Sequence, residues 1–245
     1  MIRKILLMLC VAAPAAAHDF WLEPSTFRPV PGQTFTISLL VGQDFTGDVI
    51  PRNAQLIDSF TIRDRAGEHP VNGFENQDPA GYVRLDRLGC ADIGYRSKAN
   101  PLELSEEKFN EFVRQEGINV PLARGPHREH FFRYAKAIVG GDCSDRALGY
   151  RFEIVLESVA AGVLARQARG DARLYTFRIL FEGKPLAGAL VTAMHRDDPN
   201  ARLSARSNAA GRVQFALPES GVWLVKSVHM VDSSESLWAS LIFER

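Results

Sequence analysis

Short segments with alternating apolar side chains recur along this chain, and they constrain its fold more than any other feature. Residues 34–41 place Phe35 and Ile37 on one face of an extended segment, and 56–63 and 150–157 repeat the pattern. Alternation with a period of two is typical of strands that bury one face. Glycine, proline, asparagine and aspartate between the segments favour turns. The sequence therefore predicts a mainly β chain of the sandwich type.

One part of the chain, from about 104 to 140, departs from this pattern. Ser105 can cap a helix, Phe109 begins its apolar face, and Gly117 can end it. A second helix is predicted from about 127 to 139, with its apolar side chains pointing inward. We expect the two helices to form an insertion between strands.

The strands are expected to form two domains. Small and charged residues alternate over 158–171, as is typical of a linker or domain edge. Residues 18–165 are predicted to form an Ig-like β-sandwich that carries the helical insertion, and 172–245 a second β-sandwich. Within the second domain, 177–181 and 189–195 are predicted to form a hairpin-like pair.

The start of the chain has the features of an export signal. Arg3 and Lys4 precede a short apolar run, and Ala15 and Ala17 are small residues of the kind that signal peptidase needs. The apolar run is too short for a permanent membrane-spanning helix. We expect residues 1–17 to be removed, and the mature chain to be periplasmic without direct membrane insertion.

Cleavage after Ala17 would leave His18 as the first residue, with a free α-amino group beside its imidazole. The two nitrogens can close a chelate ring on one metal ion. A simpler alternative is that His18 begins an extended segment in which the aromatic side chains of Phe20 and Trp21 are anchored against a core, and which Pro24 ends.

The mature chain would keep two cysteines, Cys90 and Cys143. An even pair in an exported protein favours one disulfide, although two cysteines so far apart in sequence could equally be buried small residues. Neither cysteine belongs to a Cys-x-x-Cys motif, which gives a redox or zinc-ribbon site no support.

The charges of the chain exclude some partners. There are 29 basic and 29 acidic residues and no basic cluster, so the chain lacks an electrostatic footprint for nucleic acid or an anionic membrane. There is also no Gly-x-Ser-x-Gly elbow, glycine-rich phosphate loop or His-Glu-x-x-His motif. We expect no enzymatic activity.

Histidines occur at two further places in the chain where they could bind a metal or need a partner. His127 and His130, with Glu129, could hold a metal at the start of the second predicted helix, but a polar helix start near solvent explains them better. His229 lies in the predicted strand 221–231 among apolar neighbours, where a buried imidazole needs a partner.

Two motifs together give a family resemblance. The segments 18–24 (HDFWLEP) and 221–231 (GVWLVKSVHMV) resemble an uncharacterised family of bacterial periplasmic proteins that are often labelled NikM-like or nickel-uptake components. The glycine and proline spacing in 183–191, with Gly211 and Gly221, is similar to the prealbumin-like modules that follow carboxypeptidases. That second resemblance implies a prealbumin-like fold for the C-terminal domain.

The family resemblance implies periplasmic handling of nickel or copper, with His18 and His229 as ligand positions. Glu235 matches an acidic position of the family, and the resemblance implies that it orients a ligand histidine. Ser233 and Ser234 depart from the family pattern, which has an Asp-Trp pair and a longer loop there. The implied partners are the metal ion and a membrane transporter or outer-membrane receptor. The alternative is a metal-free scaffolding or protein-binding module.

Overall fold

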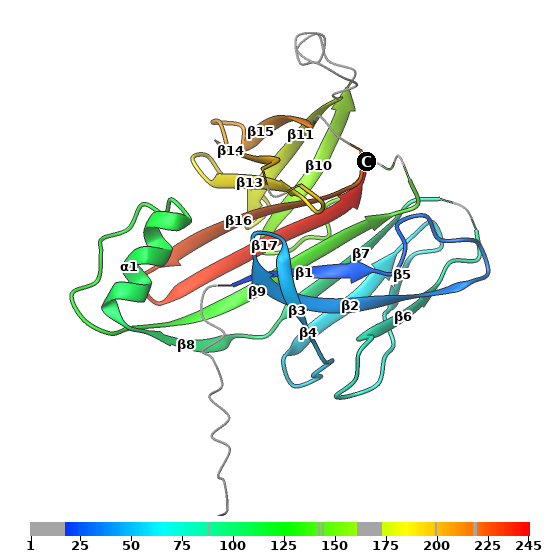
Figure 1. The fold of residues 1–245 in the computed structure, drawn as a ribbon, viewed down its shortest axis with the longest axis horizontal. Helices are drawn as coiled ribbons and strands as arrows, with labels where there is room; N and C mark the ends of the chain where they lie inside the picture. The colour runs from blue at the N-terminus through cyan, green and yellow to red at the C-terminus, as the bar shows by residue number, and fades with distance from the viewer. Residues whose placement is uncertain are drawn as a thin grey trace, which may run out of the picture.

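The computed structural model describes residues 18–87, 89–141, 143, 145–160, 173–198, 200–217 and 220–245. Three β-sheets and one helix make up this part of the chain (Figure 1). The prediction of a mainly β, sandwich-like chain is therefore confirmed. The predicted signal segment, 1–17, lies outside the described residues.

A nine-stranded sheet forms the centre of the molecule, in the order β14-β13-β16-β17-β9-β7-β4-β5, with β8 paired to β9. Its strands are β4 (Ile57–Arg63), β5 (Glu68–Pro70), β7 (Ala91–Ser97), β8 (Asn100–Leu104), β9 (His127–Val139), β13 (Leu190–His195), β14 (Arg202–Arg206), β16 (Val222–Asp232) and β17 (Glu235–Glu244). Buried apolar side chains cover both faces of the sheet, because a smaller sheet packs on each.

The two smaller sheets lie on opposite faces of the central one. The first contains β1 (Asp19–Pro24), β2 (Thr34–Gln43), β3 (Thr46–Ile50) and β6 (Gly81–Arg84). The second contains β10 (Phe152–Ala160), β11 (Arg173–Phe181), β12 (Lys184–Pro185) and β15 (Arg212–Leu217). The core of the first includes Ile37 and Leu224, and that of the second includes Phe177 and Trp223. Leu224 and Trp223 are neighbours on β16, so successive side chains of this strand enter different cores.

The prediction of a second helix over 127–139 is wrong, because these residues form strand β9. The strand pairs in parallel with β17 and antiparallel with β7. Ala135 and Ala137 enter the core beneath the first small sheet, while Tyr134 and Ile138 enter the other core. A strand buried on both faces has apolar residues at positions that also fit a helix, so its periodicity does not distinguish the two.

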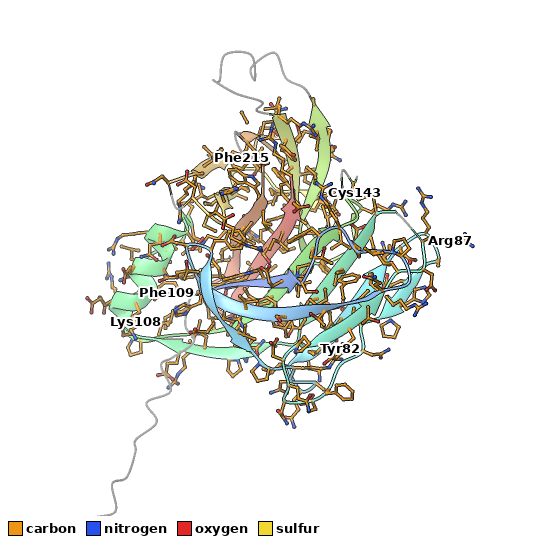
Figure 2. All side chains as sticks on the ribbon, turned by 45° about the vertical axis from the view of Figure 1, so that its right-hand side comes forward. Tyr82, Arg87, Lys108, Phe109, Cys143 and Phe215 are labelled. Atoms are coloured by element: carbon orange, nitrogen blue, oxygen red, sulfur yellow. A yellow bond between two sulfur atoms is a disulfide. The ribbon has the colours of Figure 1, made fainter. Side chains whose placement is uncertain are left out.

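The prediction of the first helix is confirmed by α1 (Glu106–Gln115). The Ser105 hydroxyl accepts a hydrogen bond from the backbone N–H of Lys108 at 3.3 Å, which caps the helix start. Phe109 and Phe112 on the helix pack against Val228, Met230 and Trp238 of the central sheet, and Figure 2 shows Phe109 on the inner side of the helix.

The predicted hairpin between 177–181 and 189–195 is also wrong. β11 pairs with β10, β12 and β15, whereas β13 pairs with β14 and β16. The intervening residues therefore cross from one sheet to another. Local alternation identified both strands, but it carries no information about their partners.

The central sheet joins the two predicted domains. β9 belongs to the first of them and β17 to the second, and they are neighbours over nine paired positions (Figure 1). Most of the predicted linker, from 161 onward, lies outside the described residues. The division into two folding units stays a prediction, which the shared sheet makes testable.

A disulfide joins Cys90 and Cys143, whose Cα atoms are 5.4 Å apart. It ties the start of β7 to the segment that follows β9, and Figure 2 labels Cys143 near the end of that strand. No helix among the described residues is long and apolar enough to cross a bilayer.

Candidate functional site around the first strand

His18 lies directly before β1, and its ring is only partly exposed. Its Nδ1 atom is buried and has no hydrogen-bond partner among the described residues. Buried polar atoms normally have a partner, because leaving one unsatisfied costs about 1–3 kcal/mol. Nδ1 is also the ring nitrogen that can form a six-membered chelate with the α-amino nitrogen of the same residue.

Strand β1 holds His18 in place. It pairs with β2 from Asp19 opposite Gly42 to Pro24 opposite Ile37. Phe20 packs against Tyr95 with ring centroids 4.9 Å apart. The anchored extended segment, given as the simpler alternative for this stretch, is thus present, and it positions the residue that the chelate hypothesis needs.

A buried lysine fixes the first residue of β1. Lys226 Nζ on β16 donates to Asp19 Oδ1 at 2.7 Å and to Glu116 Oε1 at 2.8 Å. Burial raises the pKa of Asp19, while Lys226 opposes that effect. Burial alone would lower the pKa of Lys226, but the carboxylates of Asp19 and Glu116 outweigh it and the pKa is raised. The three groups link β1, β16 and the end of α1.

His229 lies on the other face of the central sheet. It is three residues from Lys226 on β16, so the two side chains point to opposite faces. Its ring is 4.7 Å from the Phe181 ring and 5.8 Å from the Phe152 ring, centroid to centroid, both in the second small sheet. His18, next to the Lys226 partner Asp19, is on the first-sheet side. The structure therefore does not bring His18 and His229 together as ligands of one ion.

Glu235 binds an arginine rather than a histidine. Arg151 donates from its terminal nitrogen to Glu235 Oε1 at 2.6 Å, and its guanidinium lies 5.8 Å from the Phe181 ring centroid. Burial and the charge of Arg151 lower the pKa of His229. The same positive charge opposes a metal cation at His229. Glu235 thus neutralises an arginine, and its role as an orienting group for a ligand histidine stays a prediction.

His127 and His130 lie in different surroundings, because His130 is exposed whereas the His127 side chain is only 10% exposed. His127 stacks on Phe109 with centroids 3.6 Å apart, and its Nε2 is 3.1 Å from Glu129 Oε2. Glu129 is buried and also accepts a hydrogen bond from Ser236 at 2.5 Å. Among the described residues, no group of three or more His, Cys, Asp or Glu side chains is arranged to hold a metal ion.

Sequence reasoning missed Lys226 and Glu116 as parts of this site. One signal was available: Lys226 is a charged residue in the middle of an apolar strand, and a buried lysine needs a partner. Its two partners lie 207 and 110 positions away in sequence, so only the fold reveals them. Glu116 also lines a cavity of about 180 Å³ between the end of α1 and the chain before β13.

The chain was compared with known proteins. No curated protein matches it significantly. The D0-D1 domain of intimin is 14% identical, with a TM-score of 0.24, over 92% of this chain and 97% of that one. A tetra-tandem repeat in the extending region of a large adhesion protein is 12% identical, with a TM-score of 0.25, over 93% of this chain and 49% of that one. Such TM-scores support no argument from these structures.

A family model described as a domain of unknown function matches residues 15–231. The matched range includes β1, α1, the whole of β9 and nearly all of β16, which carry the groups around His18. Because the match covers most of the chain, this protein belongs to the DUF4198 family.

Proposed function

We propose that this chain is an exported, non-enzymatic protein that binds a divalent transition metal through His18 at its mature N-terminus. The observation that carries the proposal is the buried, unpartnered Nδ1 of His18. Cleavage after Ala17 supplies the α-amino nitrogen, and the two nitrogens then hold the ion in one chelate ring. Nitrogen ligands of this kind suit nickel and copper, and the affinity order of divalent metals favours copper.

The charges near His18 support a cation. Asp19 and Glu116 contribute two carboxylates, and Lys226 offsets one of them. Farther out, Arg202 lies near enough to affect Asp19 but is paired with Asp44. Asp19, Glu116 and Lys226 together therefore carry one negative charge in excess, which an α-ammonium group or a metal ion would balance, while the Arg133 guanidinium lies 5.1 Å from the Phe20 ring centroid.

The finer features of the family resemblance belong to the same proposal. A metal-binding periplasmic protein of the NikM-like type would deliver the ion to a membrane transporter or outer-membrane receptor. The C-terminal part, 172–245, would be its prealbumin-like module. His229 and Glu235 would then act apart from the His18 chelate, since β16 separates His229 from it.

The test is isothermal titration of copper and nickel into protein shown by mass spectrometry to begin at His18. We expect His18→Ala to weaken binding at least about tenfold, a loss of roughly 1.4 kcal/mol in binding free energy. A matched sample in which the α-amino group of His18 is acetylated keeps the imidazole but loses the amine ligand, so it should bind more weakly to a similar degree.

His229→Ala is the control on the opposite face of the sheet and should bind as the wild type does. Wild-type protein that binds neither metal, or that binds it equally well after acetylation of its α-amino group, would rule out the N-terminal chelate.

A second candidate, a metal-free protein-binding module, has one observation in its favour. Phe74 and Tyr82 form an exposed aromatic pair, with 62% and 38% of their surfaces accessible and ring centroids 5.8 Å apart. Exposed aromatic residues are enriched at protein interfaces. Under this alternative, a Phe74→Ser variant would lose a partner recovered by pull-down from periplasmic extract, while metal addition would change nothing.

A further inference from the structure

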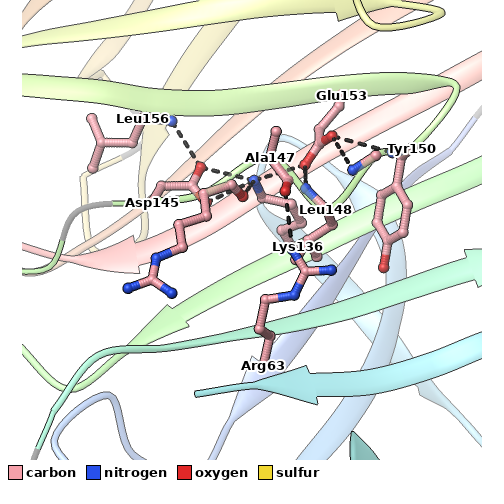
Figure 3. Close-up of polar contacts among 10 residues, drawn as sticks. Arg63, Lys136, Asp145, Ala147, Leu148, Tyr150, Glu153 and Leu156 are labelled. Atoms are coloured by element: carbon pink, nitrogen blue, oxygen red, sulfur yellow. Dashed lines mark hydrogen bonds and ion pairs between the residues drawn. The ribbon is translucent and has the colours of Figure 1, made fainter. Parts of the chain in front are cut away.

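Three ionisable side chains meet in the core far from His18 (Figure 3). Lys136 comes from β9, Glu153 from β10, and Asp145 from the segment between them. Their side chains are 2%, 1% and 0% exposed, respectively. None of them takes part in the metal site proposed above, and no catalytic or binding role explains why they are buried together.

The amine of Lys136 lies against both carboxylates. Its Nζ is 2.7 Å and 2.8 Å from the two oxygens of Asp145 and 3.1 Å from Glu153 Oε1. It also donates to the backbone carbonyl of Arg146 at 3.1 Å. The Lys136 nitrogen is a potential nucleophile, the Asp145 carboxyl carbon an electrophile and Glu153 a proton acceptor. Lys136 is in direct contact with the other two groups, and all three are buried from water.

The ionic form of this cluster is costly. Two carboxylates face one ammonium group, and a third carboxylate, Asp92, is buried nearby with its Oδ1 unpartnered. Burial raises the pKa of Asp145, although Lys136 opposes it. Removing charges from water without full compensation is unfavourable, so a reaction that removes two of these charges is favoured by the site.

We propose that Lys136 and Asp145 condense to an isopeptide amide, with Glu153 as the group that moves the proton. The Lys136 nitrogen attacks Cγ of Asp145, and one Asp145 oxygen leaves as water. The ammonium group supplies both hydrogens of that water, and Glu153 takes a proton from Nζ and returns it to the leaving oxygen. One ammonium and one carboxylate become a neutral amide and water, so atoms and charge balance without a co-reactant.

The hydrogen bonds already present suit the amide product. The backbone N–H of Leu156 donates to Asp145 Oδ2 at 2.8 Å, and this hydrogen bond remains if Oδ2 becomes the amide oxygen. The one N–H left on Lys136 Nζ can still donate to the Arg146 carbonyl oxygen or to the Glu153 carboxylate. Glu153 stays charged and accepts from the backbone N–H groups of Leu148, Gly149 and Tyr150 at 2.6, 3.1 and 3.2 Å.

The close contact of Lys136 and Asp145 would speed their condensation, and burial would protect the amide that forms. Groups held in contact react as if at very high effective concentration, which can offset the unfavourable condensation seen in dilute solution. The amide would be shielded from hydrolysis because all three side chains are at most 2% exposed.

The test is peptide mapping of the full-length protein after reduction, alkylation and trypsin digestion. In an unlinked chain, trypsin cuts after Lys136 and separates 134–136 from 137–146. The amide blocks that cut, so we expect one peptide, 134–146, lighter than its sequence mass by one water molecule. Fragment ions must place the loss across Lys136 and Asp145. Separate unmodified peptides, or water loss confined to Asp145 with Lys136 still cut, would overturn the proposal.

Two lysine variants give the matched comparison for the bond. Lys136→Met cannot form it and should give the full sequence mass of peptide 134–146, whereas the exposed Lys108→Met should keep the linked peptide.

A third variant tests the proton carrier. Glu153→Gln should leave most of the chain unlinked if Glu153 moves the proton. If this variant fails to fold, the peptide map of the wild type alone still decides whether the bond exists.

Discussion

Several residues in this protein are buried with charges that their neighbours only partly compensate. Asp92 is the clearest example on β7, because its side chain is 5% exposed and its Oδ1 has no hydrogen-bond partner among the described residues. Burial is the main cause that raises the pKa of Asp92 to about 7, and the Asp145 carboxylate adds to it while that group is not yet linked to Lys136. Such a residue makes stability depend on pH in a direction that can be worked out.

Asp92→Asn should stabilise the protein more at pH 8 than at pH 4. Between about pH 4 and 7, folded Asp92 holds a proton that the unfolded chain has released, so wild-type stability falls as pH rises and the full cost is present above pH 7. Asparagine cannot ionise, and we expect a relative gain on the order of 2 kcal/mol at pH 8. Urea unfolding of both proteins at the two pH values measures it. An equal difference at pH 4 and pH 8 would contradict the raised pKa.

At the site itself, the sequence predicted His18 but could not predict its surroundings. The signal-like start and the family resemblance both pointed to His18; its Nδ1 has no hydrogen-bond partner among the described residues, and its role as a metal ligand stays a prediction. His229 was paired with it from the same resemblance, yet β16 places its side chain on the other face of the sheet. Which face a strand residue occupies relative to a distant residue depends on sheet order, which the alternation of side chains does not encode.

At the scale of elements, strands with one polar face were predicted correctly, whereas strands buried on both faces were predicted in some cases, such as β16, and missed in others, such as β9. β2 and β4 alternate clearly and lie within two residues of their predicted ranges. β9 resembles a helix in sequence because both of its faces are apolar, and its strand form depends on β7 and β17. Short elements such as β3 and β8 were missed, since β3 is almost wholly exposed and β8 begins with Asn100-Pro101, a pair that favours a turn.

Gly94 shows how one residue sets the packing of an element. A Cβ placed on it would lie 2.1 Å from the Tyr150 hydroxyl and 2.5 Å from a Leu148 methyl group, so β7 can only accept the 145–150 segment if this position has no side chain. Gly94→Ala should destabilise the protein by about 1–3 kcal/mol in urea unfolding.

Gly125→Ala is the matched control for Gly94, because a Cβ added to Gly125 would have no neighbouring atom within 4 Å among the described residues. Its effect should be within about 0.5 kcal/mol of zero. Equal effects of the two substitutions would show that the 145–150 segment moves aside at little cost.

At the scale of the whole molecule, one sheet passes through both predicted domains. The two-domain prediction implies that 172–245 folds alone. The shared sheet implies the reverse, because this fragment would lack β9, the neighbour of β17, and β10, the neighbour of β11. We expect the isolated fragment to show no cooperative thermal unfolding, measured by circular dichroism against the full chain. A sharp transition in the fragment would restore the two-domain description.

The central sheet cannot be completed until β17 is in place. β17 follows the other described strands along the chain, and it stands between β16 and β9 near the middle of the largest sheet. Until it arrives, β9 presents an unpaired edge with apolar residues on both faces, a surface on which other extended chains can dock. If the chain is exported unfolded, as the proposed function requires, this edge of β9 stays open until β17 has crossed the membrane. The yield of folded protein should then depend on chaperones in the compartment that receives the chain.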